Sequence, residues 1–226
     1  MFVEHLHFEE YDHLESTQDY AKNKIDLKPF TVISALHQTK GHGRYTRQWL
    51  GAPGDIAITI AIPLPPNNPE QLSFVVGLAV AKTLNEFAIT TQLKWVNDVL
   101  VAGKKIAGIL LEKHQSFLLI GIGININPSS VSNTTSVNQL SNATRKGILA
   151  ALLTHFERGF NAWSAHGFTH VRNEWLANAY LLGEEIKVNF KDKVISGVFE
   201  NIDSDGKLIL KTAAGAVKIS AGEIYF

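Results

Sequence analysis

Two stretches of the sequence combine fixed positive charge with small residues. The first is Gly41-His-Gly-Arg-Tyr-Thr-Arg-Gln-Trp49. Two glycines one residue apart let a backbone approach a ligand closely, and their amides can point at anionic oxygen. Arg44 and Arg47 match phosphate or carboxylate, and Trp49 offers a flat face for an adenine. This pattern favours a loop that binds an anion, although a surface loop that needs glycine for its turns would read similarly.

The second stretch runs from Lys94-Trp-Val-Asn-Asp98 through Ala102-Gly103 to a pair of lysines ending at Lys105. A tight turn at Ala102-Gly103 would bring Asp98, a possible Mg²⁺ ligand, close to Lys105, a possible phosphate ligand. The alternative is a plain turn followed by solvated charges at a sheet edge. Gly108, three residues after Lys105, favours a ligand, because small residues inside a strand often mark a close approach.

Two further segments have modest meaning alone. Gly121-Ile-Gly-Ile-Asn125 lacks the third glycine of a dinucleotide fingerprint, and no P-loop or Gly-x-Ser-x-Gly elbow occurs anywhere. Ser16-Thr-Gln-Asp19 is typical of a helix N-terminus, with Ser16 as the cap. His5 and His7 share one face of a strand, but no third ligand has a recognisable spacing, so no metal site is predicted there.

The composition sets limits on the function. The 226 residues carry 21 basic and 21 acidic side chains, so the whole chain has no field that would attract nucleic acid or an anionic membrane. The absence of cysteine excludes disulfides, thiolate metal sites and a cysteine nucleophile. Residues 1–11 lack the apolar region of a signal peptide, and no apolar run approaches the ~18 residues that span a bilayer. We therefore expect a soluble, cytoplasmic protein.

Hydrophobic periodicity predicts the elements that position these segments. A helix is expected from Pro69 to about Phe87, with Asn68 as its N-cap and Pro69 at its first position. A second helix is expected over residues 144–163 and a third over residues 169–180. The buried side of the second is expected to carry Ile148, Leu152, His155, Phe156 and Trp163. Strands are expected at residues 56–62, 99–101, 106–111 and 117–126.

The pattern changes after Leu182-Gly183. From Glu184 to Phe226 the helical period disappears, and short alternating segments separated by turn signals predict a small barrel of about five strands. Such a barrel is near the ~40-residue limit for an independent core, so we expect it to pack on the first domain. The prediction is an α+β protein with a first domain over residues 1–181 and a second over residues 182–226.

Taken in order, these segments resemble the motifs of the biotin–protein ligases. The matching stretches are Ser16 to Gln18, Gly41 to Trp49, Lys94 to Asp98, Lys105 to Leu110, and Gly121 to Asn125. The resemblance implies a mixed sheet with flanking helices, related to the catalytic domains of class II aminoacyl-tRNA synthetases, and a C-terminal SH3-like barrel. Only fifteen residues precede Ser16, so the resemblance is to the short form without an N-terminal DNA-binding domain.

The resemblance also implies an activity. An ATP-dependent ligase of this family joins biotin and MgATP into biotinyl-5′-AMP and pyrophosphate, and then transfers biotin to a lysine of a biotin carboxyl carrier protein, a subunit of acetyl-CoA carboxylase. Attack of a carboxylate on the α-phosphate brings two anions together, so fixed cations and Mg²⁺ must offset their repulsion. Neither nucleic acid nor a membrane is an expected partner. A homodimer could form through an exposed strand edge.

The family motifs carry residue roles onto this sequence. The catalytic cations would be Lys105 and Arg44, and Asp98 would hold Mg²⁺. Biotin would be bound by Ser16, Thr17, Gln18, Gln38, Gly41, His42, Gly43, Arg44, Lys105 and Gly108. ATP and the adenylate would be bound by Arg44, Arg47, Trp49, Asn97, Asp98, Gly121, Gly123 and Asn125.

Three positions depart from the family pattern: His42 usually is arginine, Thr46 usually is glycine, and Val96 usually is proline. One hypothesis is that the adenylate is held less tightly, or released more readily near pH 6, because His42 is mostly uncharged at neutral pH. The alternative is that backbone amides dominate there. Two other functions remain open: a ligase of the same fold for lipoate or another acyl acid, and a non-catalytic binder of biotin or its adenylate.

Overall fold

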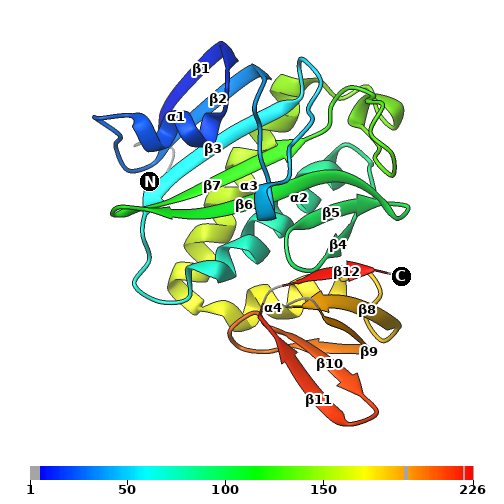
Figure 1. Ribbon diagram of the computed structural model, residues 1–226. Helices are drawn as coiled ribbons and strands as arrows, with labels where there is room; N and C mark the ends of the chain where they lie inside the picture. Colours follow the sequence, from blue (N-terminus) through cyan, green and yellow to red (C-terminus); the bar gives the residue numbers. More distant parts are fainter. Residues whose placement is uncertain (1–5, 191–192, 221, 226) are drawn as a thin grey trace.

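The computed structural model describes residues 6–190, 193–220 and 222–225, which form two sheets with four α-helices (Figure 1). The first is a seven-stranded mixed sheet of order β1-β2-β3-β7-β6-β5-β4. Strands β1 and β2 are parallel, and every other neighbouring pair is antiparallel. Its strands are β1 (His7–Leu14), β2 (Thr31–Gln38), β3 (Ile56–Pro63), β4 (Gln92–Lys94), β5 (Asp98–Val101), β6 (Lys104–His114) and β7 (Phe117–Ile124).

The two faces of this sheet are covered by different helices. Side chains alternate between the faces of a strand, and in β3 Ile60 and Ile62 join the large core while Ala61 packs with Ala21 of α1 on the other face. Helix α1 therefore covers the face opposite to α2 and α3. The helices are α1 (Thr17–Asn23), α2 (Leu72–Glu86), α3 (Arg145–His166) and α4 (Phe168–Ala177), with short 3-10 turns at η2 (Arg44–Thr46), η3 (Pro69–Gln71) and η4 (Val137–Gln139).

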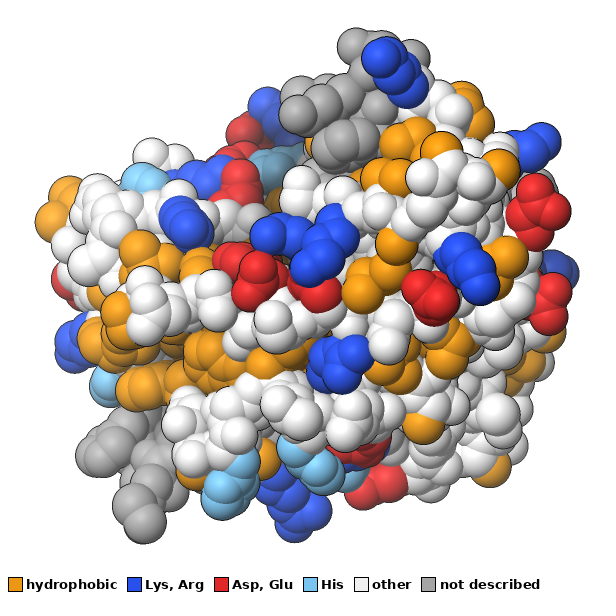
Figure 2. All heavy atoms as spheres, turned by 90° about the horizontal axis from the view of Figure 1, so that it is seen from below, with side chains coloured by type: hydrophobic (Ala, Val, Ile, Leu, Met, Phe, Trp, Pro, Cys, Tyr) orange, Lys and Arg blue, Asp and Glu red, His pale blue; other side chains and the backbone are white. Residues whose placement is uncertain are grey.

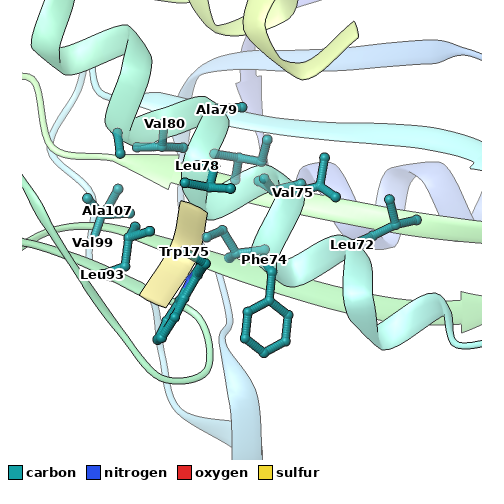
Figure 3. Packing of buried hydrophobic residues seen from close by; sticks show 14 of the residues in the cluster. Leu72, Phe74, Val75, Leu78, Ala79, Val80, Leu93, Val99, Ala107 and Trp175 are labelled. Atoms are coloured by element: carbon teal, nitrogen blue, oxygen red, sulfur yellow. The ribbon is translucent and has the colours of Figure 1, made fainter. Parts of the chain in front are cut away.

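Helix α2 is the centre of the core. Most of its side chains are buried, and Figure 3 shows them packed against the sheet and against Trp175 of α4. The ring of Phe74 meets that of Trp175 edge-on at 5.3 Å between centroids, a favourable arrangement of aromatic quadrupoles. Helix α2 therefore supports one face of the large sheet. The part of the opposite face that α1 does not cover is open to a ligand.

A five-stranded antiparallel sheet forms the C-terminal part, with the order β11-β10-β9-β8-β12. Its strands are β8 (Glu185–Phe190), β9 (Lys193–Ile202), β10 (Leu208–Thr212), β11 (Gly215–Ile219) and β12 (Glu223–Tyr225). The buried side chains Ile186, Phe199 and Leu208 belong to the same apolar cluster as α2. Trp95 also donates its indole N–H to the carbonyl of Gly206 at 3.1 Å. The small sheet therefore packs on the larger one, as expected.

Some details differ from the sequence predictions. Asn68 stands at the N-cap and Pro69 at the first position of the 3-10 turn η3 ahead of α2, but Asn68 is left-handed (φ 45°) and its side chain makes no capping bond. Helix α3 begins as predicted, because Thr144 accepts a hydrogen bond from the amide of Gly147. His155 and Trp163 are half-buried and hydrogen-bonded rather than core residues.

Other predictions agree with the structure. Ala102 (φ 48°) and Gly103 (φ 77°) make the tight turn between β5 and β6. Two left-handed residues in sequence match the right-handed twist of the flanking strands. The predicted histidine pair involves His5, which lies outside the described residues. In the described part of the chain, no helix is both long enough and apolar enough to cross a membrane.

Candidate functional site

A pocket lies on the α1 face of the large sheet, and its floor is made of glycine. Gly108 of β6 pairs with Gly123 of β7, and Gly121 follows on the same face. A Cβ atom added to Gly123 would lie 2.5 Å from the ring of Trp49, and one added to Gly108 would lie 3.1 Å from it. Only glycine at these positions leaves room for the indole to lie on the sheet.

The loop that carries Trp49 folds back over this floor. Its two arms are joined by hydrogen bonds from the amide of Trp49 to the carbonyl of Gly41, and from the amide of Gly43 to the carbonyl of Arg47, each 2.8 Å long. After the loop, the buried carboxylate of Asp55 accepts the backbone amides of Ala52 and of two residues that follow β7. Burial raises the pKa of Asp55, and these amides offset part of that increase.

Charged side chains from two separate stretches line the pocket. Lys105 Nζ lies 2.7 Å from Asp98 Oδ1 across the β5–β6 hairpin. Arg44, from the loop, donates to Asn97 Oδ1 at 3.4 Å, and Asn97 Nδ2 donates to the carbonyl of Ile109 at 2.8 Å. The loop and the hairpin therefore meet at Asn97, the residue before Asp98.

The pocket is cationic although the chain as a whole has no net charge. Among the described side chains that line it, Asp98 is the one acid, whereas the bases are Arg44, Arg47, Lys94 and Lys105. A concave site lined by one sign of charge concentrates counter-ions. The arrangement is suited to binding an anionic ligand such as a phosphate or a carboxylate.

The donor set decides how a magnesium ion could be held. In the part of the chain that the structure describes, no three metal-ligating side chains gather into a cluster. Mg²⁺ usually takes one or two carboxylates from the protein, together with water and substrate phosphates. Asp98 can supply one such carboxylate, so the residues present fit an ion brought in with a nucleotide rather than a resident one.

The N-terminus of α1 contributes buried polar groups to the same pocket, next to the basic side chains. Ser16 caps the helix by accepting the amide of Asp19, and Ser16, Thr17 and Gln18 are each 3–4% exposed. The backbone amide of Thr17 donates to Gln38 Oε1 at 2.8 Å. Polar side chains buried next to a pocket can fix the orientation of a ligand.

Most of the predicted site residues line this pocket, but two do not. Gly41 lies under the side chain of Gln38, so close that a Cβ atom there would lie 2.2 Å from Gln38 Nε2. Asn125 donates to the carbonyl of Thr135 at 3.0 Å and that of Lys105 at 3.4 Å. It therefore holds the segment after β7 against Lys105 instead of facing the pocket.

Several residues of the site were missed by the sequence analysis. Pocket-lining residues without a predicted role are Tyr45, Gln48, Ala57, Ile58, Lys94, Trp95, Ile109, Leu110, Ile122, Gly222 and Ile224. Gly222 and Ile224 come from the C-terminal sheet, and Arg44 reaches the carbonyl of Gly222 at 3.5 Å. Nothing in the sequence indicates that contact. Thr59, which supports the pocket from β3, could have been noticed as one hydroxyl in an otherwise apolar strand.

The three departures from the family pattern lie around the loop and the hairpin. His42 Nε2 lies 3.6 Å from Asp19 Oδ1 of α1. The peptide bond between Trp95 and Val96 is cis, and the carbonyl of Val96 accepts the hydroxyl of Ser73 at 2.8 Å. Thr46 lies within η2, and its side chain is outside the described part of the structure.

Comparisons with known proteins agree on one family. Residues 11–128 match the biotin/lipoate A/B protein ligase family, and residues 181–226 match the biotin protein ligase C terminal domain. A biotin–[acetyl-CoA-carboxylase] ligase of Paracoccus denitrificans is 34% identical over 219 residues, 86% of this chain and 89% of the relative. The bifunctional ligase/repressor BirA of Bacillus subtilis (strain 168) is 32% identical over 238 residues, 95% of this chain and 72% of the relative.

The fold is also shared with solved structures. A biotin protein ligase from Aquifex aeolicus, in complex with biotin and ATP, superimposes with a TM-score of 0.89 at 28% sequence identity. The alignment covers 97% of both chains, so it includes the large sheet, its helices and the C-terminal sheet.

Proposed function

The chain belongs to the biotin protein ligase family, and from that premise we propose that it is an ATP-dependent ligase for biotin. It forms biotinyl-5′-AMP and transfers biotin to a specific lysine of the biotin carboxyl carrier protein of acetyl-CoA carboxylase. The observation that carries this proposal is one pocket in which Lys105, from the hairpin, and Arg44, from the loop, stand over a floor of glycine.

The first half-reaction needs the cations. A carboxylate oxygen of biotin attacks the α-phosphorus of ATP, the bond from that phosphorus to the bridging oxygen breaks, and pyrophosphate leaves. Lys105 and Arg44 stabilise the charge that develops on the phosphoryl oxygens. Holding both reactants in one pocket supplies much of the remaining acceleration. Trp49, lying on Gly108 and Gly123, separates this polar end from the sheet.

The second half-reaction uses the same pocket. The neutral amine of a carrier lysine attacks the acyl carbon of the mixed anhydride, the carbon–oxygen bond to phosphate breaks, and AMP leaves. The nitrogen loses one proton to solvent as the amide forms. The acyl carbon must therefore face the open side of the pocket, where the carrier can approach. Lys105 also stabilises the leaving AMP, because it faces the phosphate in both steps.

Magnesium is proposed as the metal of the first step, held by Asp98 together with the phosphates of the nucleotide. When bound, it would neutralise phosphate charge that the four basic side chains leave uncompensated. Asp98 lies 2.7 Å from Lys105, so its carboxylate also orients the lysine within the pocket.

The remaining proposals concern localisation, partners, oligomeric state and the domain boundary. We place the reaction in the cytoplasm, because it consumes ATP. We expect no dependence on nucleic acid, in line with the equal numbers of basic and acidic residues. Strand β1 forms an edge of the large sheet and could pair with a second copy, so a homodimer is proposed. The domains are proposed to divide at residues 181 and 182.

Pyrophosphate release tests the proposed function directly. Purified protein is incubated with ATP and, in turn, biotin, lipoate and octanoate, and pyrophosphate is measured. Biotin-dependent release, followed by gain of one biotinyl group on a carrier domain but not on its lysine-to-arginine variant, is the expected result. Release with lipoate alone would assign the chain to another acid, and biotin binding without release would make it a binding protein.

A further inference from the structure

A buried hydroxyl links the parts of the biotin end of the pocket. Thr59 is 0% exposed, and its neighbours in β3 are alanine and isoleucine. Its Oγ1 lies 2.9 Å from Thr17 Oγ1 and 2.9 Å from Gln18 Oε1. A buried hydroxyl costs free energy unless it is hydrogen-bonded, so its two neighbours account for its presence in an apolar strand.

The hydroxyl of Thr59 is the donor toward both of these neighbours. Gln18 Nε2 lies 3.3 Å from the backbone carbonyl of Leu119, and a carbonyl oxygen can only accept. The amide nitrogen therefore faces Leu119, and the amide oxygen faces Thr59. That amide oxygen can only accept, and Thr17 Oγ1 is also an acceptor toward Thr59, so the single hydrogen of Thr59 is directed at these two neighbours.

The hydrogen-bonding roles of Thr17 and Gln38 follow from this arrangement. Because Thr59 is the donor in its contact with Thr17, the hydrogen of Thr17 goes to Gln38 Oε1 at 3.2 Å and points into the protein. Towards the pocket Thr17 presents lone pairs. Gln38 lines the pocket, and its Oε1 accepts the backbone amide of Thr17 at 2.8 Å, so the group that Gln38 has left for a ligand is its Nε2 donor.

We propose that Thr59 is a positioning residue that fixes the hydrogen-bond polarity of this subsite, with an acceptor at Thr17 and a donor at Gln38. The subsite then selects a ring that carries an N–H beside a carbonyl, as a cyclic urea or a lactam does. A dithiolane ring has neither group and leaves both Thr17 and Gln38 unpaired. This inference rests on the proposed function, because it assigns the acid-binding end of the same pocket to the ureido ring of biotin.

The test compares Thr59→Val, which keeps the shape and removes the hydroxyl, with Thr59→Ser, which keeps the hydroxyl. Thr83→Val is the matched control, because Thr83 is also 0% exposed and its hydroxyl bonds within α2 to the carbonyl of Ala79. The dissociation constant for biotin is measured by titration calorimetry. KM for biotin, KM for ATP and kcat are measured by pyrophosphate release, and desthiobiotin and lipoate serve as ring probes.

Thr59→Val should weaken biotin and desthiobiotin binding at least ~10-fold, the scale of leaving a buried acceptor without its donor. KM for ATP and kcat at saturating biotin should stay within about threefold, and lipoate should be little affected. Thr59→Ser and Thr83→Val should bind biotin within about threefold of the unsubstituted protein. If Thr59→Val does not fold, Thr59→Ala replaces it, since alanine already stands at residues 57 and 61 of the same face.

Unchanged biotin affinity in Thr59→Val would overturn the inference. So would a parallel rise in KM for ATP that serine does not correct, because that result indicates general damage to the sheet. The calorimetric constant is measured without turnover, so it tests Thr59 even if the protein binds biotin but releases no pyrophosphate. That combination would reject the proposed ligase activity and leave the role of Thr59 to be decided by affinity alone.

Discussion

At the scale of single residues, the site combines one acid and several bases at short range. Lys105 and Asp98 form an ion pair of 2.7 Å, with side chains 33% and 22% exposed. A phosphate entering the pocket competes with Asp98 for the hydrogens of Lys105. The contribution of Lys105 to catalysis is therefore a difference: its interaction with the phosphate in the transition state minus its interaction with Asp98 in the resting protein.

Replacing Lys105 with alanine should slow adenylation at least ~100-fold, the scale of losing one cation that acts on the transition state. Lys104→Ala is the control, because Lys104 is the adjacent lysine and is exposed. Single-turnover pyrophosphate release gives the rate, and circular dichroism checks the fold. Near-normal rates in a folded Lys105→Ala protein would remove Lys105 from the catalytic role.

His42 gives a second prediction at this scale. The sequence leaves open whether this side chain or the backbone amides of the loop hold the adenylate. His42 Nε2 lies 3.6 Å from Asp19, which also pairs with Lys22 at 3.3 Å. An arginine at this position would carry a permanent charge beside Asp19 and hold the loop against α1, so His42→Arg should release the adenylate a few-fold more slowly.

Single-turnover dissociation of the adenylate from the unsubstituted protein and from His42→Arg, compared at neutral pH, measures this effect. If the unsubstituted protein and His42→Arg release the adenylate at the same rate, the side chain has no part in holding the loop.

At the scale of elements, tight turns hold the strands in position. The turn between β9 and β10 is organised by Asp203, whose Oδ1 accepts the backbone amides of Asp205 at 2.9 Å and Lys207 at 3.0 Å. Burial raises the pKa of Asp203, but the amide of Lys207 and the ammonium of Lys218 outweigh it, and the pKa lies below its ordinary value of 3.8. The folded protein therefore prefers the ionised carboxylate.

The lowered pKa of Asp203 determines how its contribution to the free energy of unfolding changes with pH. Because the folded-state pKa is lowered, the stabilisation from Asp203 is complete above the ordinary pKa and is lost as the pH falls through the lowered value. Asp203→Ala should lower the free energy of unfolding by about 1–3 kcal/mol at neutral pH, since two half-buried backbone amides lose their charged acceptor. The difference between the two proteins, measured by urea unfolding at pH 7, 4.5 and 3, should shrink at the lowest pH. A difference independent of pH would contradict the assignment.

The elements also show what the sequence could predict. Thr144 and the Ala102-Gly103 turn are local signals, so the start of α3 and the β5–β6 hairpin were predicted correctly. Strand β2 (Thr31–Gln38) was not predicted, because five consecutive buried residues show no alternation that separates a strand from a helix. The capping bond predicted for Asn68 is absent because its backbone is left-handed (φ 45°) and not in the extended conformation from which an N-cap side chain reaches the helix amides.

At the scale of the whole molecule, the two sheets share one core. Residues of α2, of the large sheet and of the C-terminal sheet, among them Phe74, Ile120 and Leu210, belong to a single buried cluster. A Cβ atom on Gly206, in the β9–β10 turn, would lie 2.8 Å from the ring of Phe74, so the two parts are in close contact. Figure 2 shows the underside of the molecule as a continuous surface with charged and apolar side chains interspersed.

This shared core predicts a single unfolding transition. Calorimetry should show one thermal peak whose calorimetric and van't Hoff enthalpies agree, because separating the sheets would expose apolar surface on both. Two resolved peaks, or loss of the C-terminal sheet at a lower temperature than the large sheet, would show that the two parts are energetically independent.

The same scale explains which parts of the site the sequence left out. Motifs within one stretch, such as the loop of Arg44 and the hairpin of Lys105, were recognised because their chemistry depends on near neighbours. Gly222 meets Arg44 across 178 positions in the sequence, and Thr59 meets Gln18 across 41 positions. Such contacts are set by packing of the whole fold, and no local pattern encodes them.

The central claim is that positive side chains from two separate stretches act on one phosphorus. A crystal structure of the protein with biotin and a non-hydrolysable ATP analogue tests it most directly. We predict that Lys105 Nζ and the guanidinium of Arg44 both contact oxygens of the α-phosphate, with the biotin carboxylate in line for attack. A nucleotide bound elsewhere, or an α-phosphate touched by only one of the two stretches, would contradict the account.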